Sequence, residues 1–116
     1  MNIEPKACPV TLSIVDQTGK IDPAVVIIET KTEPVMVVNN PTDADVTVIF
    51  PHGVSGSGSI FSVKKNETVS IPIDGRAPHR VEIPYWVFFS FTEGDDRTNV
   101  HDWGRAASPP TMVLYP

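Results

Sequence analysis

The chain has 116 residues, of which 41% are hydrophobic and 20% charged, and its formal net charge is -5. This length predicts one domain over residues 1–116, and no apolar run approaches the roughly 18 residues of a membrane-spanning helix. The acidic balance disfavours a nucleic-acid partner, because phosphates are bound by clustered cations and only Lys64 and Lys65 are adjacent. With Cys8 as its one cysteine, the chain has neither an intrachain disulfide nor a CxxC pair.

The N-terminal segment MNIEPKACPV contains no apolar region typical of a signal peptide. We therefore expect a cytoplasmic protein from the sequence as it stands, and a periplasmic or secreted one if a leader has been removed.

Twelve prolines spread over the chain leave little room for helices, so strands are expected to build the domain. The first is ACPVTLSIV, in which apolar residues alternate with polar ones and point to the core: Cys8, Val10, Leu12 and Ile14. After a turn at DQTGK, the segments AVVIIET and PVMVVNN are apolar on both faces, which predicts strands in the middle of a packed sheet. The KTEP segment between them is expected to form a tight turn.

DVTVIF predicts a strand with Val46, Val48 and Phe50 on one face, and the Gly- and Ser-rich segment His52–Ser59 predicts a flexible loop. IFSVKKNETVSIPID indicates two short strands joined around KKNE, and Pro72 predicts that the second lies at a sheet edge.

RVEIPYWVFFSF is a long aromatic strand, with a bend expected at Pro84 and with both faces expected to be buried. TEGDDRTNVHDWGRAASPP is the longest polar connection, and TMVLYP is the closing strand. About eight strands of this kind predict an all-β, two-sheet antiparallel Greek-key β-sandwich.

The order of these segments resembles the cupredoxin family over most of the chain. The resemblance rests on PVMVVNN, ADVTVIFP, a loop, FSVKKNETVSIPI, an aromatic strand and PTMVLYP. In that family a strand ends in an Asn pair, a short turn carries a histidine ligand, and an aromatic strand leads into a Cys, His and Met loop. An immunoglobulin-like sandwich has the same strand count and pattern, and it remains the alternative fold.

The resemblance places Asp45 at the first copper histidine and Ser90, or a neighbour of it, at the thiolate, and Asp and Ser side chains cannot build a type 1 copper site. His101 and Met112 follow, but Ser90 and Met112 lie further apart than the ligands of the family's compact loop. The resemblance therefore implies a cupredoxin-like frame without type 1 copper and without a cofactor.

A rearranged copper or zinc site is the alternative. It would use His52, His79 and His101, with Asp102 or Asp95 completing the shell. None of these residues has the spacing of an HxH or HExxH motif, so three separate solvated imidazoles are the preferred interpretation.

Nothing in the sequence favours an enzyme, because it has no GxSxG elbow and Cys8 is expected to face inward. The preferred hypothesis is a non-enzymatic binding or assembly module whose loops 52–59 and 93–110 recognise a protein partner. The candidate contact residues are His52, Asp95, Asp96, Arg97, His101 and Trp103. The edge strand TVSIPID is a further candidate for pairing with a partner strand, although Pro72 weakens it. The sequence leaves the oligomeric state open.

Overall fold

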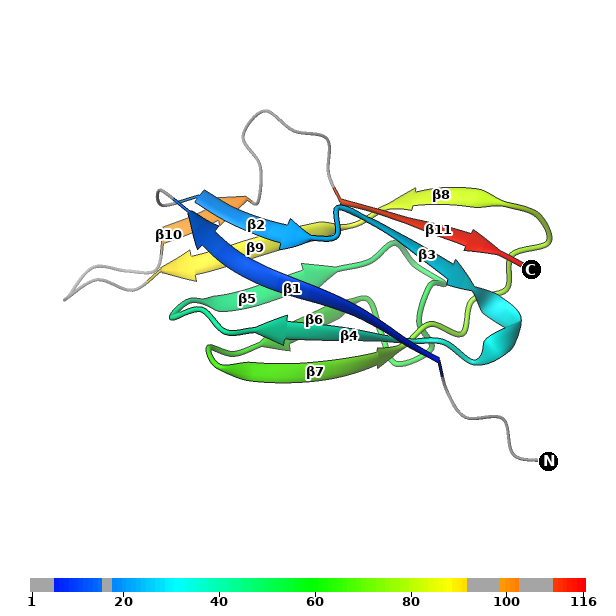
Figure 1. The fold of residues 1–116 in the computed structure, drawn as a ribbon, viewed down its shortest axis with the longest axis horizontal. Coiled ribbons are helices and arrows are strands. Elements are labelled where there is room, and N and C mark those ends of the chain that lie inside the picture. Colours follow the sequence, from blue (N-terminus) through cyan, green and yellow to red (C-terminus); the bar gives the residue numbers. More distant parts are fainter. Residues whose placement is uncertain (1–5, 16–17, 92–98, 103–109) are drawn as a thin grey trace.

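The computed structural model describes residues 6–15, 18–91, 99–102 and 110–116. These residues form eleven strands and one short 3-10 helix, η1, and they contain no α-helix (Figure 1). The elements are β1 (Ala7–Val15), β2 (Thr18–Asp22), β3 (Val25–Glu29), η1 (Thr30–Thr32), β4 (Val35–Asn40), β5 (Asp45–Ile49), β6 (Ile60–Val63), β7 (Glu67–Pro72), β8 (Val81–Pro84), β9 (Trp86–Phe91), β10 (Asn99–Asp102) and β11 (Thr111–Tyr115).

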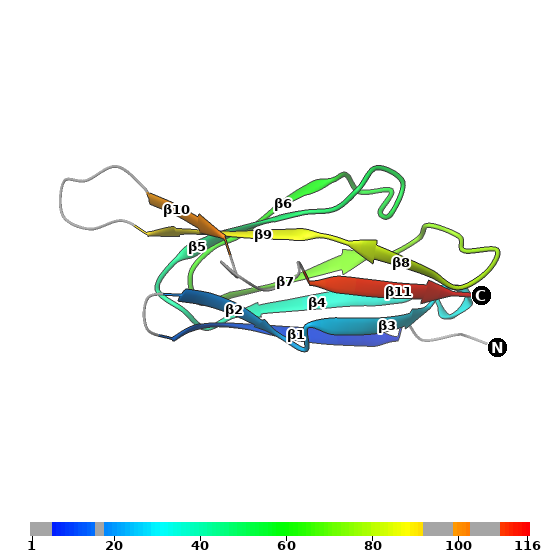
Figure 2. The same ribbon diagram turned by 90° about the horizontal axis from the view of Figure 1, so that it is seen from above.

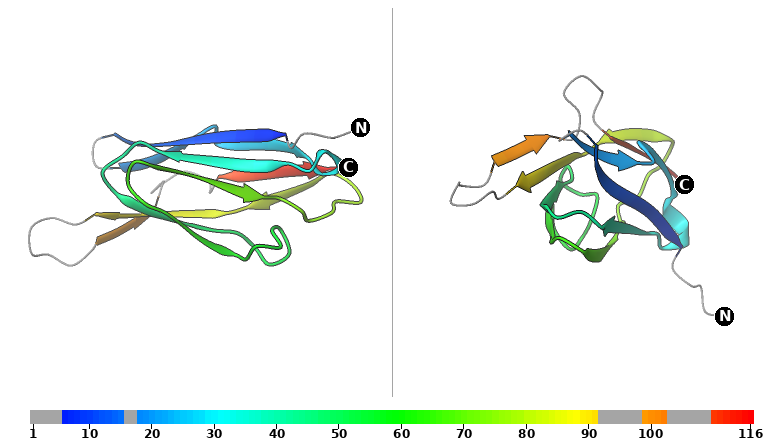
Figure 3. Two further views of the ribbon diagram at one scale, coloured as in Figure 1. Left: turned by 90° about the horizontal axis from the view of Figure 1, so that it is seen from below. Right: turned by 60° about the vertical axis from the view of Figure 1, so that its left-hand side comes forward.

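The strands form two four-stranded sheets that face each other and a three-stranded sheet beside them (Figure 2). We name them by one strand each: the β4 sheet (β2-β1-β4-β7), the β5 sheet (β10-β9-β5-β6) and the β11 sheet (β3-β11-β8). Because β2 continues into β3 and β8 continues into β9, the β11 sheet is built from extensions of both layers around β11. Figure 3 shows β11 (red) between the two layers in its left panel.

The all-β, sandwich-like architecture is confirmed, but the expectation of two purely antiparallel sheets is wrong. There are three sheets, and two of the strand pairs, β1 with β4 and β3 with β11, are parallel. Residue alternation specifies which face of a strand is buried, and it carries no information about the direction of the neighbouring strand.

The alternating pattern located most of the core correctly. Cys8, Val10 and Leu12 in β1 are buried, as are Val46 and Val48 in β5, whereas Ile14 is only partly buried. The long aromatic segment bends where Pro84 predicted it, because β8 and β9 belong to different sheets. β7 is an edge strand of the β4 sheet, as its proline indicated.

Several local predictions are corrected by the structure. The turn at DQTGK is shorter than expected, because β2 already begins at Thr18. β3 is an edge strand with two exposed apolar side chains and is not central. β6 and β7 belong to different sheets, so the KKNE turn connects the two layers. β10 lies within the segment 93–110 that was predicted to be a loop.

Tyr85 links the β5 sheet to the β11 sheet at the junction of β8 and β9. Its side chain is fully buried, and its ring meets that of Phe50 edge-on at a centroid distance of 5.6 Å. The backbone N-H of Tyr85 donates to the carbonyl oxygen of Pro110 at 3.0 Å, directly before β11. Edge-to-face packing of this kind stabilises aromatic pairs beyond the area they bury.

Asn40, the last residue of β4, ties the two layers together. Its side chain is only 1% exposed. The amide nitrogen Nδ2 lies 2.8 Å from the carbonyl oxygen of Ala44, 3.0 Å from that of Val63 and 3.2 Å from that of Lys64. An amide has two hydrogens, so these three carbonyl oxygens share them.

The oxygen of the same Asn40 side-chain amide stabilises the turn between β4 and β5. Oδ1 of Asn40 accepts hydrogen bonds from the backbone N-H of Thr42 at 3.1 Å and from its hydroxyl at 2.6 Å. One buried side chain therefore fixes the end of a strand in the β4 sheet against β6 and the approach to β5 in the opposite layer.

Replacing this amide tests its contribution. We expect Asn40→Ala to lower the free energy of unfolding by about 2–4 kcal/mol, because buried carbonyl groups lose their donors. Asn39→Ala is the matched control: Asn39 is half-buried, and its side-chain contacts with described residues are a 3.0 Å bond with the Thr68 hydroxyl and a 3.5 Å contact with the Val10 carbonyl oxygen. Urea unfolding of both variants measures the difference, and equal losses would contradict the role assigned to Asn40.

Candidate binding surface

The two positions that the cupredoxin resemblance assigns to a histidine and a cysteine lie side by side. Asp45 begins β5 and stands directly opposite Ser90 of β9 in the antiparallel ladder. Asp45 is exposed and Ser90 is half-buried, whereas their neighbours Val46 and Phe89 are buried, so the pair belongs to the outer face of the β5 sheet. Oδ1 of Asp45 accepts a 3.0 Å hydrogen bond from the backbone N-H of Lys65. This hydrogen bond ties the start of β5 to the turn between β6 and β7.

Met112, which the resemblance sets at the axial copper ligand, does not join this pair. Met112 is fully buried in β11, which belongs to a different sheet from Asp45 and Ser90. The backbone of His101 pairs with Phe89 in β10, next to Ser90 in register. A buried thioether and an outward carboxylate do not converge on one metal ion.

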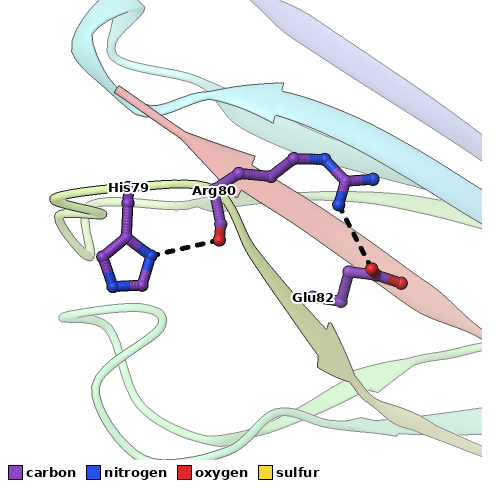
Figure 4. Close-up of polar contacts among 3 residues, drawn as sticks. All are labelled: His79, Arg80 and Glu82. Carbon is purple, nitrogen blue, oxygen red and sulfur yellow. Dashed lines mark hydrogen bonds and ion pairs between the residues drawn. The ribbon is translucent and has the colours of Figure 1, made fainter.

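The three histidines are also not gathered at one end of the sandwich. His52 and His79 lie in the β5–β6 and β7–β8 connections, at the end of the molecule opposite β10, which carries His101 (Figure 1). The exposed His79 donates from Nδ1 to the carbonyl oxygen of Arg80 at 3.2 Å, and Arg80 forms a 3.2 Å ion pair with Glu82 (Figure 4). Among the described side chains, no three His, Cys, Asp or Glu residues are arranged to hold a metal ion.

Asp102, a candidate metal ligand, ends β10, where its backbone pairs with Phe88. Four predicted site residues lie outside the described residues: Asp95, Asp96, Arg97 and Trp103.

The loop 52–59 is anchored, in contrast to the flexible loop that its composition predicted. Val54 and Ser55 are buried, at 3% and 8% exposure. The N-H of Gly56 donates to Oδ1 of Asp74 at 2.6 Å, and the N-H of Gly75 donates to the carbonyl oxygen of Val54 at 3.1 Å. The backbones approach so closely that a Cβ on Gly75 would lie 2.6 Å from the Gly53 carbonyl oxygen. A glycine-rich composition predicts a flexible loop, but it does not show that the Val54 side chain is buried in the core.

The structure reveals an apolar surface that the sequence analysis missed. Ile49 stands opposite Ile60 on one side and opposite Trp86 on the other, and Phe88 follows on the same face of β9. Ile60 is 70% exposed and Trp86 36% exposed, while Ile49 and Phe88 are half-buried. We call these four residues the Trp86 face. The expectation that both faces of the aromatic strand are buried is therefore wrong.

The Trp86 face is continuous with the anchored loop. The ladder between β5 and β6 continues past Ile49 and Ile60, because the N-H of Phe50 donates to the carbonyl oxygen of Ser59 at 2.8 Å. The loop is thus the tip of the hairpin that carries half of the face. The sequence feature that could have indicated this apolar surface is Ile60, a large apolar residue that directly follows the glycine-rich loop at the start of a strand containing Ser62.

Features that would support catalysis are weak in the described residues. A cavity of about 370 Å³ lies where β4 begins and β7 ends, lined by Thr30, Glu33, Pro34, Val35, Pro72, Ile73, Asp74 and Arg76. It contains no histidine or cysteine to pair with a nucleophile. Burial raises the pKa of the Cys8 thiol, an effect that the charge of Lys6 partly offsets, so Cys8 is disfavoured as a nucleophile.

Tyr85 carries the one buried side-chain oxygen that lacks a hydrogen-bond partner among the described residues. Burial of the phenol raises its pKa well above the ordinary value. The folded protein therefore keeps this group neutral at a pH where an unfolded chain ionises it.

No protein-family model, curated protein or solved structure matches this chain. Within the described residues, no helix has the length and apolar character needed to cross a membrane.

Asp74→Ala tests the anchoring of the loop. We expect faster hydrogen exchange at the Gly56 amide, because its acceptor is lost, with a change in the free energy of unfolding below about 1 kcal/mol. Asp43→Ala is the control, since Asp43 is also exposed and lies in the β4–β5 connection. Unchanged protection of Gly56 in Asp74→Ala would show that the loop is held by other contacts.

Tyr85→Phe tests the buried hydroxyl. We expect the free energy of unfolding at neutral pH to rise by about 1 kcal/mol, because an unsatisfied polar group is removed. The advantage of the variant should grow above about pH 10, where ionisation of Tyr85 in the unfolded chain destabilises the unsubstituted protein. Denaturant unfolding across this pH range measures both effects, with Tyr115→Phe as control. A lower stability of Tyr85→Phe would reveal a hydrogen-bond partner, such as a buried water.

Proposed function

We propose that this protein is a non-enzymatic binding or assembly module on a cupredoxin-like sandwich that lacks type 1 copper. The observation that carries the proposal is the Trp86 face, a contiguous apolar surface beside an anchored loop. Exposed aromatic and aliphatic side chains of this kind are typical of surfaces that bind a protein partner. The loop 52–59 is anchored through Val54 and Gly56, and anchored residues lose less conformational entropy on binding than unanchored ones.

The cupredoxin-like part of the proposal is supported by the frame around Asp45 and Ser90. A strand ending in an Asn pair is followed by a short turn, and the two positions assigned to copper ligands are neighbours across a ladder. A carboxylate and a hydroxyl occupy these positions, and Asp45 already accepts a backbone hydrogen bond. At a position where the cupredoxin family has a metal ligand, Asp45 thus binds the backbone of the β6–β7 turn.

The Trp86 face extends the loop hypothesis formed from the sequence. His52 is exposed at the tip of the same hairpin that carries Ile60, so a partner bound across the face would reach it. Ser62 and Thr47 stand opposite each other next to the apolar residues and supply hydroxyl groups at the border. An apolar centre with a polar rim is the usual organisation of a protein interface.

A photoreactive residue in place of Ser62 tests this proposal in the cell that naturally makes the protein. We expect a discrete cross-linked protein adduct from position 62 and none from position 70, because Ser70 is exposed on the outer face of the β4 sheet. Adding Ile60→Lys or Trp86→Ser should remove the adduct while the thermal unfolding midpoint stays close to that of the unsubstituted chain. Equal labelling from positions 62 and 70, or an adduct unaffected by Ile60→Lys, would contradict the proposal.

A further inference from the structure

We propose that the cavity between η1 and the end of β7 binds a free amino acid with an apolar side chain. In this proposal Glu33 and Asp74 hold the ammonium group of the ligand, and Arg76 holds its carboxylate. The cavity shares no residue with the Trp86 face, so the inference does not depend on the proposed function. Figure 1 shows η1 and the arrowhead of β7 at the same end of the molecule.

The cavity has the volume and the apolar lining of a small-molecule site. Its volume of about 370 Å³ lies within the range of roughly 300–1,000 Å³ that is usual for such sites. Half of its lining residues are apolar, namely Pro34, Val35, Pro72 and Ile73. Val35 and Pro72 stand opposite each other in the ladder between β4 and β7, and both are only half-buried. They therefore keep apolar surface that a ligand can cover.

Backbone hydrogen bonds hold the walls of the cavity in place. The N-H of Ile73 donates to the carbonyl oxygen of Pro34 at 2.9 Å, which joins the end of β7 to the start of β4. On the other side, the hydroxyl of Thr30 donates to the carbonyl oxygen of Tyr115 at 3.1 Å, which joins η1 to the end of β11. A site whose walls are fixed in advance loses little conformational entropy when a ligand binds.

Three charged side chains line the same cavity without pairing with one another. Glu33 and Asp74 are negative and Arg76 is positive, and all three are exposed. Within the described part of the chain, the one ion pair joins Arg80 to Glu82. The guanidinium of Arg76 and the two carboxylates are thus separated groups around an apolar lining.

Separated charges of opposite sign match a ligand that carries both signs. An amino acid has an ammonium and a carboxylate group at one end of its side chain. Arg76 can bind the carboxylate through two parallel hydrogen bonds, and the ammonium can donate to Glu33 and Asp74. Asp74 has an oxygen for this role, because Oδ1 accepts the N-H of Gly56 and Oδ2 makes no hydrogen bond to a described residue. A simple cation would be repelled by Arg76, and a simple anion by the two carboxylates.

The backbone of Glu33 also favours a role for its side chain. Glu33 ends η1 in the left-handed conformation, at φ 54 and ψ 58. Glycine adopts this conformation without steric cost, whereas a residue with a Cβ is strained in it. A glutamate at a position that suits glycine places a carboxylate at the cavity at some cost in stability.

An NMR titration of the isotope-labelled full chain with leucine tests the proposal. We expect saturable shifts at millimolar leucine, concentrated at the amides of Glu33, Val35 and residues 73–76. Three analogues each remove one feature of the ligand: leucinamide lacks the carboxylate, N-acetylleucine lacks the ammonium group and glycine lacks the side chain. Each should bind at least about tenfold more weakly than leucine, because a charge-assisted hydrogen bond or an apolar contact is lost.

Variants that remove one charge identify the binding groups. Arg76→Gln and Glu33→Gln should each weaken leucine binding at least about tenfold. Lys65→Gln and Glu67→Gln are the matched controls, because they remove the same charges at the opposite end of β7. Glu33→Gly should weaken binding while the thermal unfolding midpoint stays the same or rises, which separates the loss of the carboxylate from a loss of folding.

The absence of a saturable shift with leucine, or shifts centred on residues outside the cavity, would overturn the proposal. Leucinamide or N-acetylleucine binding as tightly as leucine would also contradict it, as would equal affinities of Arg76→Gln and Lys65→Gln for leucine.

Discussion

The architecture depends on the buried side chain of Asn40, which holds the end of β4 against the opposite layer. Among the described strands, no ladder joins the β4 sheet to the β5 sheet, so packing and side-chain contacts fix the relative position of these two layers. One amide satisfies carbonyl groups from Ala44, Val63 and Lys64, and these belong to the segments that border β5 and β6. The position of the β5–β6 hairpin, and with it the loop and the Trp86 face, follows from this contact.

The strand faces were readable from the sequence because burial on one side of a strand leaves a period of two. Val10 and Leu12 in β1 and Val46 and Val48 in β5 were assigned to the core for this reason, and proline marked the bend at Pro84. The order of strands was not readable, since the parallel neighbour β4 of β1 is decided by packing among segments distant in the sequence. Short polar strands such as β10 also lack the apolar alternation that would distinguish them from a loop.

The candidate surfaces were harder to predict than the core. A run such as VVII or WVFF has the same appearance whether one or both of its faces are covered, so Ile27 and Trp86 were expected to be buried. Alternation could not have shown that Asp45 and Ser90 stand opposite each other, because it does not specify which strands pair. Loop 52–59 was misjudged because anchoring by Asp74 depends on a residue outside the loop.

The account assigns different tasks to different parts of one sandwich: an interior fixed by Asn40 and Tyr85, and an outer apolar face for a partner. Its central claim is that binding, and not metal chemistry, is the purpose of this frame. Metal content of protein purified without a histidine tag, measured by mass spectrometry before and after dialysis against equimolar Cu(II) and Zn(II), tests that claim most directly. The account predicts no stoichiometric metal in any sample. One bound metal ion per chain, lost in His101→Ala, would contradict it.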